Sequence, residues 1–254
     1  MIAITHVPSP HMEQCQRTYV GPAAIDCERA ARQHADYCRT LRDCGAEVVT
    51  LDVNRDLPDC VFVEDTAIVL DEVAVLASMG AESRRAEPAG IEPELRKYRD
   101  VERVELPATI EGGDVLRVGR TLLVGLSSRT NAAGAGALAA VARRYGYRVV
   151  TVQVNGCLHL KTACTALDDA SLLVNPDWLD VRALRGYELV RVPAEEPWAA
   201  NVAHVGGRVC VAAAHGRTAE LLRGRGLDVR TVDLSEFAKA EGGVTCMSLL
   251  FRAR

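Results

Sequence analysis

Three short segments, far apart in the sequence, carry side chains that could together form a thiol catalytic centre. Cys246 follows a glycine pair and precedes a short apolar run, which would anchor a rigid turn. His159 stands at a predicted junction between a strand and a loop, and Glu111 and Asp114 surround a second glycine pair. A cysteine, a histidine and a carboxylate can supply a nucleophile, a proton carrier and its partner. These segments therefore predict nucleophilic chemistry by a thiol.

Each of these residues also has a purely structural interpretation. Cysteine is most often a buried core residue, and the other eight cysteines fit that description. Cys246 differs because it follows a glycine-rich turn, in a position whose counterparts elsewhere in the chain are polar. His159 could be structural, or could form half of a metal pair with Cys157. A second ligand pair at metal spacing is missing from the sequence, so we expect neither a metal nor another cofactor.

Acidic and basic residues near the candidate centre indicate the kind of ligand. Glu64 and Asp65 directly follow an apolar run, and burying such charges is costly unless they are paired. Adjacent carboxylates favour a cationic ligand. Arg84 and Arg129 occupy equivalent positions in neighbouring units and suggest that this ligand also carries a carboxylate, which arginine can bind bidentately.

An internal repeat predicts the fold. Short apolar hairpins around tight Gly or Asp turns recur about every 40 to 50 residues, and most lead into a helix and a further strand. The hairpins span 64–77, 113–125, 162–174 and 201–211, and the predicted helices span 24–44, 132–145 and 218–225. Residues 246–251 and 2–5 would form a fifth unit from both termini. The pattern predicts an α/β fold, a five-fold propeller of strand–strand–helix–strand modules, with residues 1–254 as a single domain.

The repeat also predicts where the polar residues lie. Equivalent positions in a closed ring point at one centre. The polar residues at the start of the first strand of each unit should therefore converge; they are Glu64, Asp65, Glu111, Asp114, His159, Asn201 and Cys246.

Composition restricts the remaining possibilities. The chain has 254 residues, 48% hydrophobic and 25% charged, which is typical of a globular protein. A net charge of −4 with dispersed arginines argues against nucleic-acid binding. We expect no signal peptide, no membrane span and no membrane partner. Nine cysteines without a Cys-x-x-Cys pair favour reduced thiols in the cytoplasm. The oligomeric state is left open, with a homodimer as one candidate.

Several motifs, in order from the helix near residue 24 onwards, resemble those of the dimethylarginine dimethylaminohydrolase family of the guanidine-modifying pentein superfamily, whose fold is the five-fold α/β propeller. The motifs are Asp59-Cys60-Val61-Phe62-Val63-Glu64-Asp65, Gly80-Ala81-Glu82-Ser83-Arg84-Arg85, Glu111-Gly112-Gly113-Asp114, Ser128-Arg129-Thr130-Asn131, Leu158-His159-Leu160-Lys161-Thr162, Ala199-Ala200-Asn201 and Gly242-Gly243-Val244-Thr245-Cys246-Met247-Ser248.

The resemblance implies a role for individual residues. Cys246 matches the nucleophile, His159 the proton donor and base, and Glu111 the carboxylate associated with that histidine. Further positions match substrate contacts: Asp59, Glu64 and Asp65 (the last on the guanidinium), Arg84 and Arg129 at the amino-acid end, and Ala240 through its backbone. Residues 11–20 depart from the family, which has a flexible lid with a substrate-contacting leucine there. Arg17 falls near that leucine and is a further candidate contact.

The implied reaction is hydrolysis of Nω-methylated L-arginine to L-citrulline and methylamine or dimethylamine, through a covalent thiouronium on the cysteine. Three alternatives stay open. An arginine deiminase would release ammonia, an amidinotransferase would pass the same intermediate to an amine, and a non-catalytic protein would only bind arginine-like cations.

Overall fold

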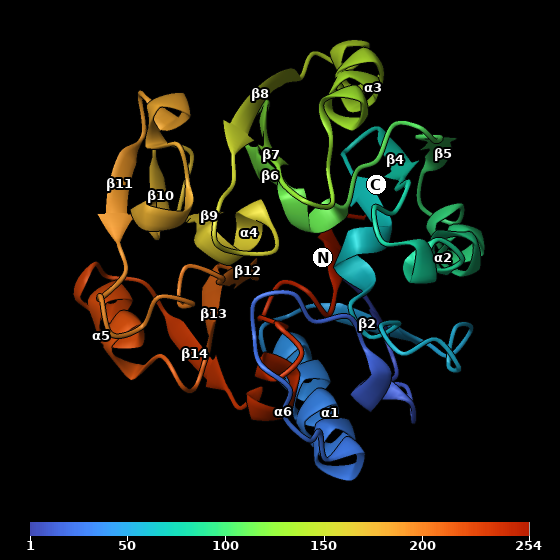
Figure 1. Cartoon of the computed structure of the whole chain (residues 1–254). Helices are drawn as coiled ribbons and strands as arrows, with labels where there is room; N and C mark the ends of the chain where they lie inside the picture. The colour runs from blue at the N-terminus through green and yellow to red at the C-terminus, as the bar shows by residue number, and fades with distance from the viewer. Residues whose placement is uncertain (254) are drawn as a thin grey trace.

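Five small sheets form a ring in the computed structural model, which describes residues 1–253 (Figure 1). Each sheet, or blade, has three strands: an antiparallel pair and a third strand that runs parallel to the central one. In ring order the blades are β15 (Leu249–Phe251), β1 (Ile2–His6) and β2 (Glu47–Leu51); β3 (Ala67–Val69), β4 (Val73–Leu76) and β5 (Asp100–Arg103); β6 (Val115–Val118), β7 (Thr121–Leu126) and β8 (Arg148–Gln153); β9 (Cys164–Ala166), β10 (Ser171–Val174) and β11 (Glu188–Arg191); and β12 (Ala203–Val205), β13 (Arg208–Ala212) and β14 (Val229–Val232). The predicted five-fold α/β propeller is confirmed.

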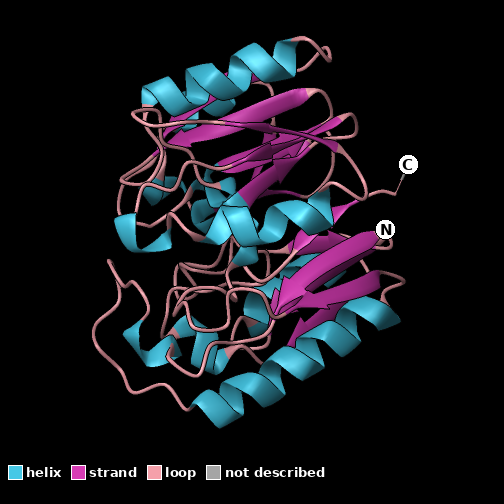
Figure 2. Ribbon diagram, turned by 90° about the vertical axis from the view of Figure 1, so that its right-hand side faces the viewer, coloured by secondary structure: helices cyan, strands magenta, loops and turns pink. Residues whose placement is uncertain are grey.

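The longer helices lie at the outside of the ring, as Figures 1 and 2 show. Asp26 caps α1 (Cys27–Asp43) by accepting a hydrogen bond from Arg29 N, and Asn131 caps α3 (Ala132–Arg143) in the same way through Gly134 N. Gly146, with a φ of 77°, follows the end of α3. The helices are α1 (Cys27–Asp43), α2 (Glu87–Leu95), α3 (Ala132–Arg143), α4 (Leu160–Ala163), α5 (Gly216–Gly224) and α6 (Ser235–Ala238), with 3₁₀ turns η1 (Met12–Gln14), η2 (Val63–Thr66), η3 (Glu82–Arg84), η4 (Gly112–Asp114), η5 (Pro176–Trp178) and η6 (Val181–Leu184).

The predicted helices are found with small shifts at their ends. Two features of the blades were not predicted. Helix α2 occupies the connection in the second blade, and the fourth blade carries the short turns η5 and η6 instead of a long helix. Pro88 and Pro93 made α2 hard to foresee, although proline is tolerated in a first helical turn, where Pro88 lies.

The ring is closed by strands from the two ends of the chain. β1 pairs antiparallel with β15, with Ile2 opposite Phe251 and Ile4 opposite Leu249. The termini accordingly lie near each other at one edge of the molecule in Figure 2. The fifth unit predicted from both termini is therefore confirmed.

The prediction that the central polar residues start the strands needs correction. Glu64, Asp65 and Asp114 lie in the 3₁₀ turns η2 and η4, which precede β3 and β6. His159 comes directly before α4, and Cys246 lies in a turn ahead of β15. The physical reason is side-chain direction. Consecutive residues of a strand point to opposite faces, whereas a helical turn lets neighbours such as Glu64 and Asp65 both reach the centre.

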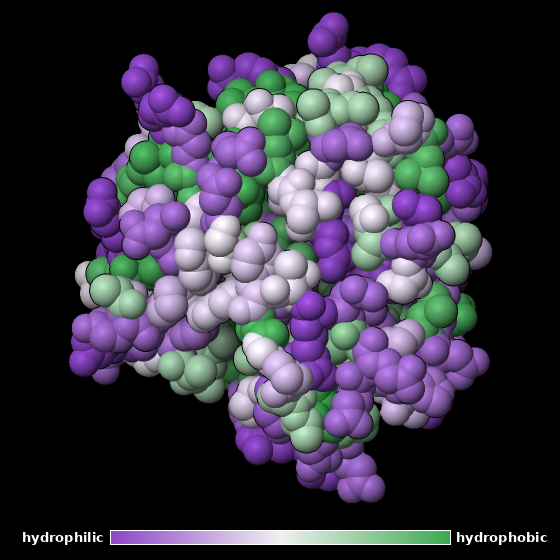
Figure 3. Space-filling view, in the orientation of Figure 1, coloured by the Kyte–Doolittle hydropathy of each residue, from purple (hydrophilic) through white to green (hydrophobic). Residues whose placement is uncertain are grey.

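Apolar side chains fill the spaces around and between the blades. The buried clusters consist mainly of valine, leucine and alanine, in keeping with the low aromatic content of 4%. Hydrophilic side chains cover most of the rim of the face seen in Figure 3. Among residues 1–253, none of the helices has the length and apolar character needed to span a bilayer.

Candidate active site

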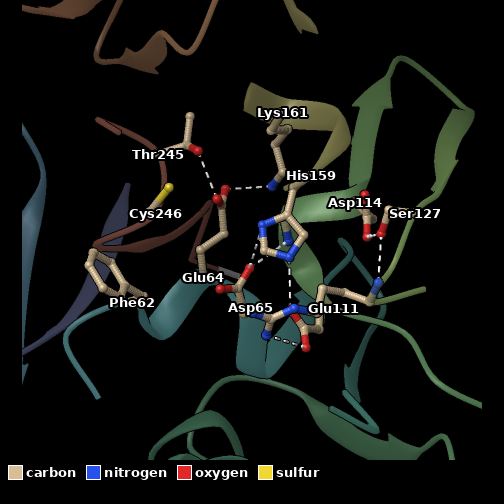
Figure 4. A network of polar contacts seen from close by, with 12 residues as sticks. Phe62, Glu64, Asp65, Glu111, Asp114, Ser127, His159, Lys161, Thr245 and Cys246 are labelled. Atoms are coloured by element: carbon tan, nitrogen blue, oxygen red, sulfur yellow. Dashed lines mark hydrogen bonds and ion pairs between the residues drawn. The ribbon is translucent and has the colours of Figure 1, made fainter. Parts of the chain in front are cut away.

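His159 and Glu111 form the centre of the polar site. His159 Nε2 lies 2.7 Å from Glu111 Oε2, and His159 Nδ1 lies 3.7 Å from Asp65 Oδ1 (Figure 4). Glu111 and His159 are 0% and 4% exposed, so water contributes little to either charge. The two side chains come from different blades, just before η4 and just before α4.

The surroundings favour the protonated form of His159. Burial opposes the charge, but Asp65, Asp114 and Glu111 outweigh it and raise the pKa of His159 to about 9. Burial likewise opposes the charge of Glu111. The hydrogen bond from His159 and the nearby arginines nevertheless lower the pKa of Glu111 to about 2. At neutral pH the pair is an imidazolium and a carboxylate, and the imidazolium has a proton to give.

Asp65 is held in place beside this pair. Its Oδ2 accepts a 2.7 Å bond from Arg84 Nη1, and its Oδ1 accepts a 3.0 Å bond from Gly113 N. A Cβ atom at Gly113 would lie 2.6 Å from Asp65 Oδ1 and 2.7 Å from His159 Nδ1, so only glycine fits at this position.

Arg84 donates hydrogen bonds to several protein groups. Besides Asp65, it binds both oxygens of Glu87 and the carbonyl of Phe62, and it is 3% exposed. This geometry makes Arg84 an orienting partner of Asp65 in the state described here. Glu87 was not singled out from the sequence, although its position three residues after Arg84 is the spacing at which helical side chains meet.

Cys246 lies across the site from His159 (Figure 4). Its Sγ accepts a 3.2 Å bond from Gly243 N, so the predicted glycine-rich turn does hold the thiol. Within residues 1–253 no hydrogen bond joins this sulfur to the imidazole. Burial, Glu64 and Asp65 raise the pKa of the Cys246 thiol to about 12. The thiol is therefore neutral at physiological pH, and a cation between it and the carboxylates would favour the thiolate.

Glu64 connects the thiol loop of the first blade to Lys161 of the fourth blade. Its Oε1 accepts a 2.5 Å bond from Lys161 Nζ, and its Oε2 accepts a 2.7 Å bond from the Thr245 hydroxyl (Figure 4). Asn201 accepts a bond from Thr245 N and donates to the hydroxyl of Thr245 and to the carbonyl of Lys161. Lys161 and Thr245 stood inside the quoted motifs but were not assigned a role. The role of Lys161 and Thr245 depends on contacts between blades, and these contacts cannot be read from a linear sequence.

Asp114 has a supporting place. It accepts a 2.6 Å bond from the Ser127 hydroxyl and a 2.9 Å bond from Leu160 N, next to His159. Burial raises the pKa of Asp114 to about 6. Asp114 therefore holds in place the backbone next to His159.

Arg129 is the candidate with an unused donor. It is 7% exposed, and its buried Nη1 forms a 3.6 Å ion pair with Glu111 Oε1 but makes no hydrogen bond within residues 1–253. An unsatisfied buried guanidinium nitrogen suits the carboxylate of a ligand. Arg217, which has a similar position in a later unit, lies instead on the surface and pairs with Glu195.

A covering segment, residues 11–26, reaches the site from the N-terminal side. Its residue Gln16 donates its backbone N–H to the buried carboxylate of Asp59 at 3.1 Å, and burial raises the pKa of Asp59. Arg17 binds the carbonyls of Glu13 and Ala23, both within the covering segment. In this state Arg17 therefore shapes the segment, and the predicted contact with a ligand stays untested.

Glu241 ties the covering segment to the loop that carries the thiol. One oxygen of its carboxylate accepts the backbone N–H groups of Thr18, Tyr19 and Val20. Glu241 has a φ of 61°, in the left-handed region that non-glycine residues rarely adopt. It follows the buried Ala240, the position expected to offer a backbone contact. Sequence reasoning missed Glu241, because no local pattern announces a carboxylate that binds a segment more than two hundred residues away.

A cavity of about 150 Å³ borders this junction. It is lined by Val20 of the covering segment, by Trp198 and by Glu241, and it meets the thiol loop at Gly243. Its walls are largely apolar, and it lies beside the carboxylate cluster rather than within it.

Donor atoms for a metal come closest together at Asp65, Glu111 and His159, which lie within 4.8 Å of one another. These atoms already make hydrogen bonds within the protein: Asp65 accepts from Arg84 and Gly113, and Glu111 and His159 bind each other. The trio is better suited to bind a cation with N–H donors and to move protons.

Five α/β blades around a buried polar centre define a protein of the pentein class. The chain belongs to the dimethylarginine dimethylaminohydrolase family, because the family model described as "N,N dimethylarginine dimethylhydrolase, eukaryotic" matches residues 11–249. This membership confirms the resemblance carried by the motifs.

Individual relatives agree with the family match. The N(G),N(G)-dimethylarginine dimethylaminohydrolase of Pseudomonas aeruginosa is 37% identical over 89% of this chain and 90% of its own length. The protein of the same name from Streptomyces coelicolor is 41% identical over 98% of this chain and 96% of its own. A solved structure of the Pseudomonas aeruginosa enzyme, a cysteine-to-serine mutant with citrulline, has 34% sequence identity and a TM-score of 0.90, and 98% of each chain is covered.

Proposed function

We propose that this protein hydrolyses Nω-methylated L-arginine, with dimethylarginine as the main substrate, to L-citrulline and methylamine or dimethylamine. One observation carries the proposal. The Cys246 thiol lies beside buried carboxylates that raise its pKa and opposite the imidazole of His159, and a cation bound between them would lower the pKa of the thiol. Relatives that carry the dimethylaminohydrolase name over nearly the whole chain support the same choice of substrate.

Binding is the first step of the proposed reaction. The guanidinium lies against Asp65 and Glu64, which fix its orientation by charge-assisted hydrogen bonds. Its positive charge offsets the effect of these carboxylates on Cys246 and lowers the pKa of the thiol. The amino-acid end meets Arg129, whose Nη1 is free of a hydrogen bond, and Asp59 and the backbone of Ala240 complete the contacts.

Chemistry then follows in two displacements. The Cys246 thiolate forms a bond to the guanidinium carbon, the bond from that carbon to the methylated nitrogen breaks, and His159 gives its proton to the departing amine. What is left is a thiouronium on Cys246. A water molecule adds to its carbon and His159 takes up one water proton. The carbon–sulfur bond then breaks as the second proton goes to the sulfur, which releases citrulline and the Cys246 thiol. Glu111 keeps the imidazole oriented in both steps.

No cofactor or metal has a part in this scheme. We propose that residues 1–254 act as a single catalytic domain in the cytoplasm, on a small cationic amino acid. The nine cysteines, none of them in a disulfide, suit a reducing compartment.

The decisive experiment compares kcat/KM for dimethylarginine, monomethylarginine and arginine, with citrulline and the released amine both quantified. We expect a clear preference for a methylated substrate and one amine per citrulline. A ratio favouring arginine, with ammonia as product, would instead identify an arginine deiminase. Transfer of the amidino group to an added amine would indicate an amidinotransferase, and binding without turnover would leave a binding protein.

A further inference from the structure

Lys161 is a partly buried cation that the scheme above leaves unused. It lies in α4, two residues after His159, and its side chain is 15% exposed. Its ammonium donates to Glu64 Oε1 at 2.5 Å. Figure 4 shows it entering the site from the side of His159 and pointing at Glu64. Glu64 is a carboxylate proposed to contact the substrate, so the position of a largely buried lysine beside it needs a physical explanation.

The contacts of Glu64 continue from Lys161 to the nucleophile. The other carboxylate oxygen accepts the Thr245 hydroxyl at 2.7 Å, and Thr245 directly precedes Cys246. The backbone adds a second connection, since Glu64 N donates to Cys246 O at 3.1 Å. Any rotation of the Glu64 carboxylate would therefore shift the residue beside the thiol.

Asn201 closes these contacts into a ring. Its amide oxygen accepts Thr245 N at 3.0 Å, and its amide nitrogen donates at 3.0 Å to both the Thr245 hydroxyl and the Lys161 carbonyl. A Cβ atom at Gly243 would lie 2.4 Å from the Asn201 oxygen, which shows how tightly the thiol loop fits against this side chain. The ring joins residues from four blades through hydrogen bonds that are buried or partly buried.

We propose that Lys161 is a positioning residue for the reaction: its ammonium fixes the Glu64 carboxylate, and through Thr245 it fixes the loop that holds Cys246. This inference rests on the proposed function for its kinetic consequences, but the ring of contacts itself does not depend on the substrate. Lys161 thereby sets the guanidinium site and the nucleophile with respect to each other.

The charge of Lys161 has a second effect on Glu64. Burial raises the pKa of Glu64, and Lys161 provides the largest effect in the opposite direction. The titratable groups that face Glu64 are Lys161, Asp65, Cys246 and Tyr37. Asp65 disfavours its ionisation further. Loss of the ammonium would therefore let Glu64 take up a proton at a higher pH.

The test uses Lys161→Met, which keeps most of the stem and removes the charge. We expect kcat/KM to fall by about a hundredfold, the scale of a small misplacement of reacting groups. The acid limb of the kcat/KM–pH profile should move to higher pH, because Glu64 must be ionised to bind the guanidinium. Lys97→Met is the matched control: Lys97 pairs with Glu94 at 2.6 Å on the surface, and its loss should leave both readouts unchanged.

Two further variants separate the parts of the proposal. Thr245→Val keeps the shape of the side chain and cuts the link to Glu64, so it should lower kcat by roughly tenfold. It should move the acid limb less than Lys161→Met does, because the Thr245 hydroxyl lowers the pKa of Glu64 less than the charge of Lys161 does. The double variant Lys161→Met, Glu64→Gln should be no slower than Glu64→Gln alone, since Lys161 acts through Glu64. Additive losses in the double variant would contradict that route.

A readout without substrate distinguishes this inference from the proposed function. Amide hydrogen exchange of the peptide 242–248 should be roughly tenfold faster in Lys161→Met and Thr245→Val than in the wild type, at an unchanged exchange rate in α3. If the wild type fails to hydrolyse methylarginines but this difference is found, only the proposed function is lost. Unchanged exchange together with an unmoved acid limb in Lys161→Met would overturn the positioning role.

Discussion

The imidazole of His159 and the carboxylate of Glu111 share a 2.7 Å hydrogen bond in a site from which water is almost excluded. The pair carries opposite charges, since the pKa of His159 is raised to about 9 and that of Glu111 lowered to about 2. A histidine in this state serves first as an acid and only later as a base.

Replacing Cys246 by serine should preserve the fold and abolish turnover, because a hydroxyl is far less acidic than a thiol. Mass spectrometry of wild-type enzyme quenched during turnover should find an adduct on the peptide that contains Cys246. Cys164, another thiol in the same spectrum, is 0% exposed and serves as the internal control. An adduct on a different cysteine, or an active serine variant, would move the nucleophile elsewhere.

Removing the imidazole in His159→Gly should slow turnover by at least roughly a hundredfold, the usual scale for a lost general acid–base group. Substrate binding should be affected less than kcat, since the carboxylates and Arg129 remain. Isothermal titration with dimethylarginine, in a Cys246→Ser background to prevent turnover, measures that binding. Near-normal turnover in His159→Gly would assign proton transfer to another group.

The raised pKa of His159 predicts how thermal stability depends on pH. From about pH 6.5 to 9 the folded protein keeps a proton that the unfolded chain loses, so the stability from this group is complete below 6.5 and is lost as the pH rises through 9. The upper limit is roughly 3 kcal/mol, or a fall in Tm of roughly 5 to 10 °C. Between pH 6.5 and 9 the Tm of the wild type should fall relative to the Tm of His159→Gln. Plots of Tm against pH that run parallel for the two proteins would refute the assignment.

Glu241→Gln should loosen the covering segment. An amide oxygen replaces a charged acceptor of three backbone N–H groups, and bonds to charged groups are the stronger ones. We expect trypsin to cut after Arg17 roughly tenfold faster, and KM to rise more than kcat falls. Cleavage after the exposed Arg182 provides the control. Equal cleavage rates after Arg17 in both proteins would mean that Glu241 does not hold the segment.

Activity should withstand dialysis against chelators, because the proposed chemistry uses protein groups alone. The assay compares kcat before and after dialysis and after addition of single divalent metals. Loss of activity that one metal restores would require a different mechanism.

The five blades could be predicted from the sequence because every unit repeats the same local pattern. Hairpins around Gly or Asp turns, helix caps such as Asn131 and the final glycines are encoded by neighbouring residues. The convergence of Glu64, Glu111, His159 and Cys246 followed from ring symmetry. The short turns that carry these residues could not be predicted, because the side chains in the turns pair with residues of other blades.

Contacts between blades were the part that the sequence concealed. Lys161 reaches Glu64 across 97 residues of sequence, and Glu241 reaches Thr18 across 223. Arg84 is expected at the amino-acid end of a ligand; in this structure it donates to Asp65, Glu87 and Phe62, and its contact with a ligand stays a prediction. Such choices depend on which partner is nearer once the ring is closed, and this is a property of tertiary structure.

The pairing of β1 with β15 has a consequence for the order in which the enzyme matures. β1 is synthesised early and β15 late, so one edge of β1 stays unpaired during synthesis until β15 is made. Cys246 lies just ahead of β15, so the turn that holds it is anchored on its C-terminal side by this last pairing. A nascent chain with four finished blades would therefore have its acids and its imidazole but no working nucleophile, and activity would begin only when the ring closes.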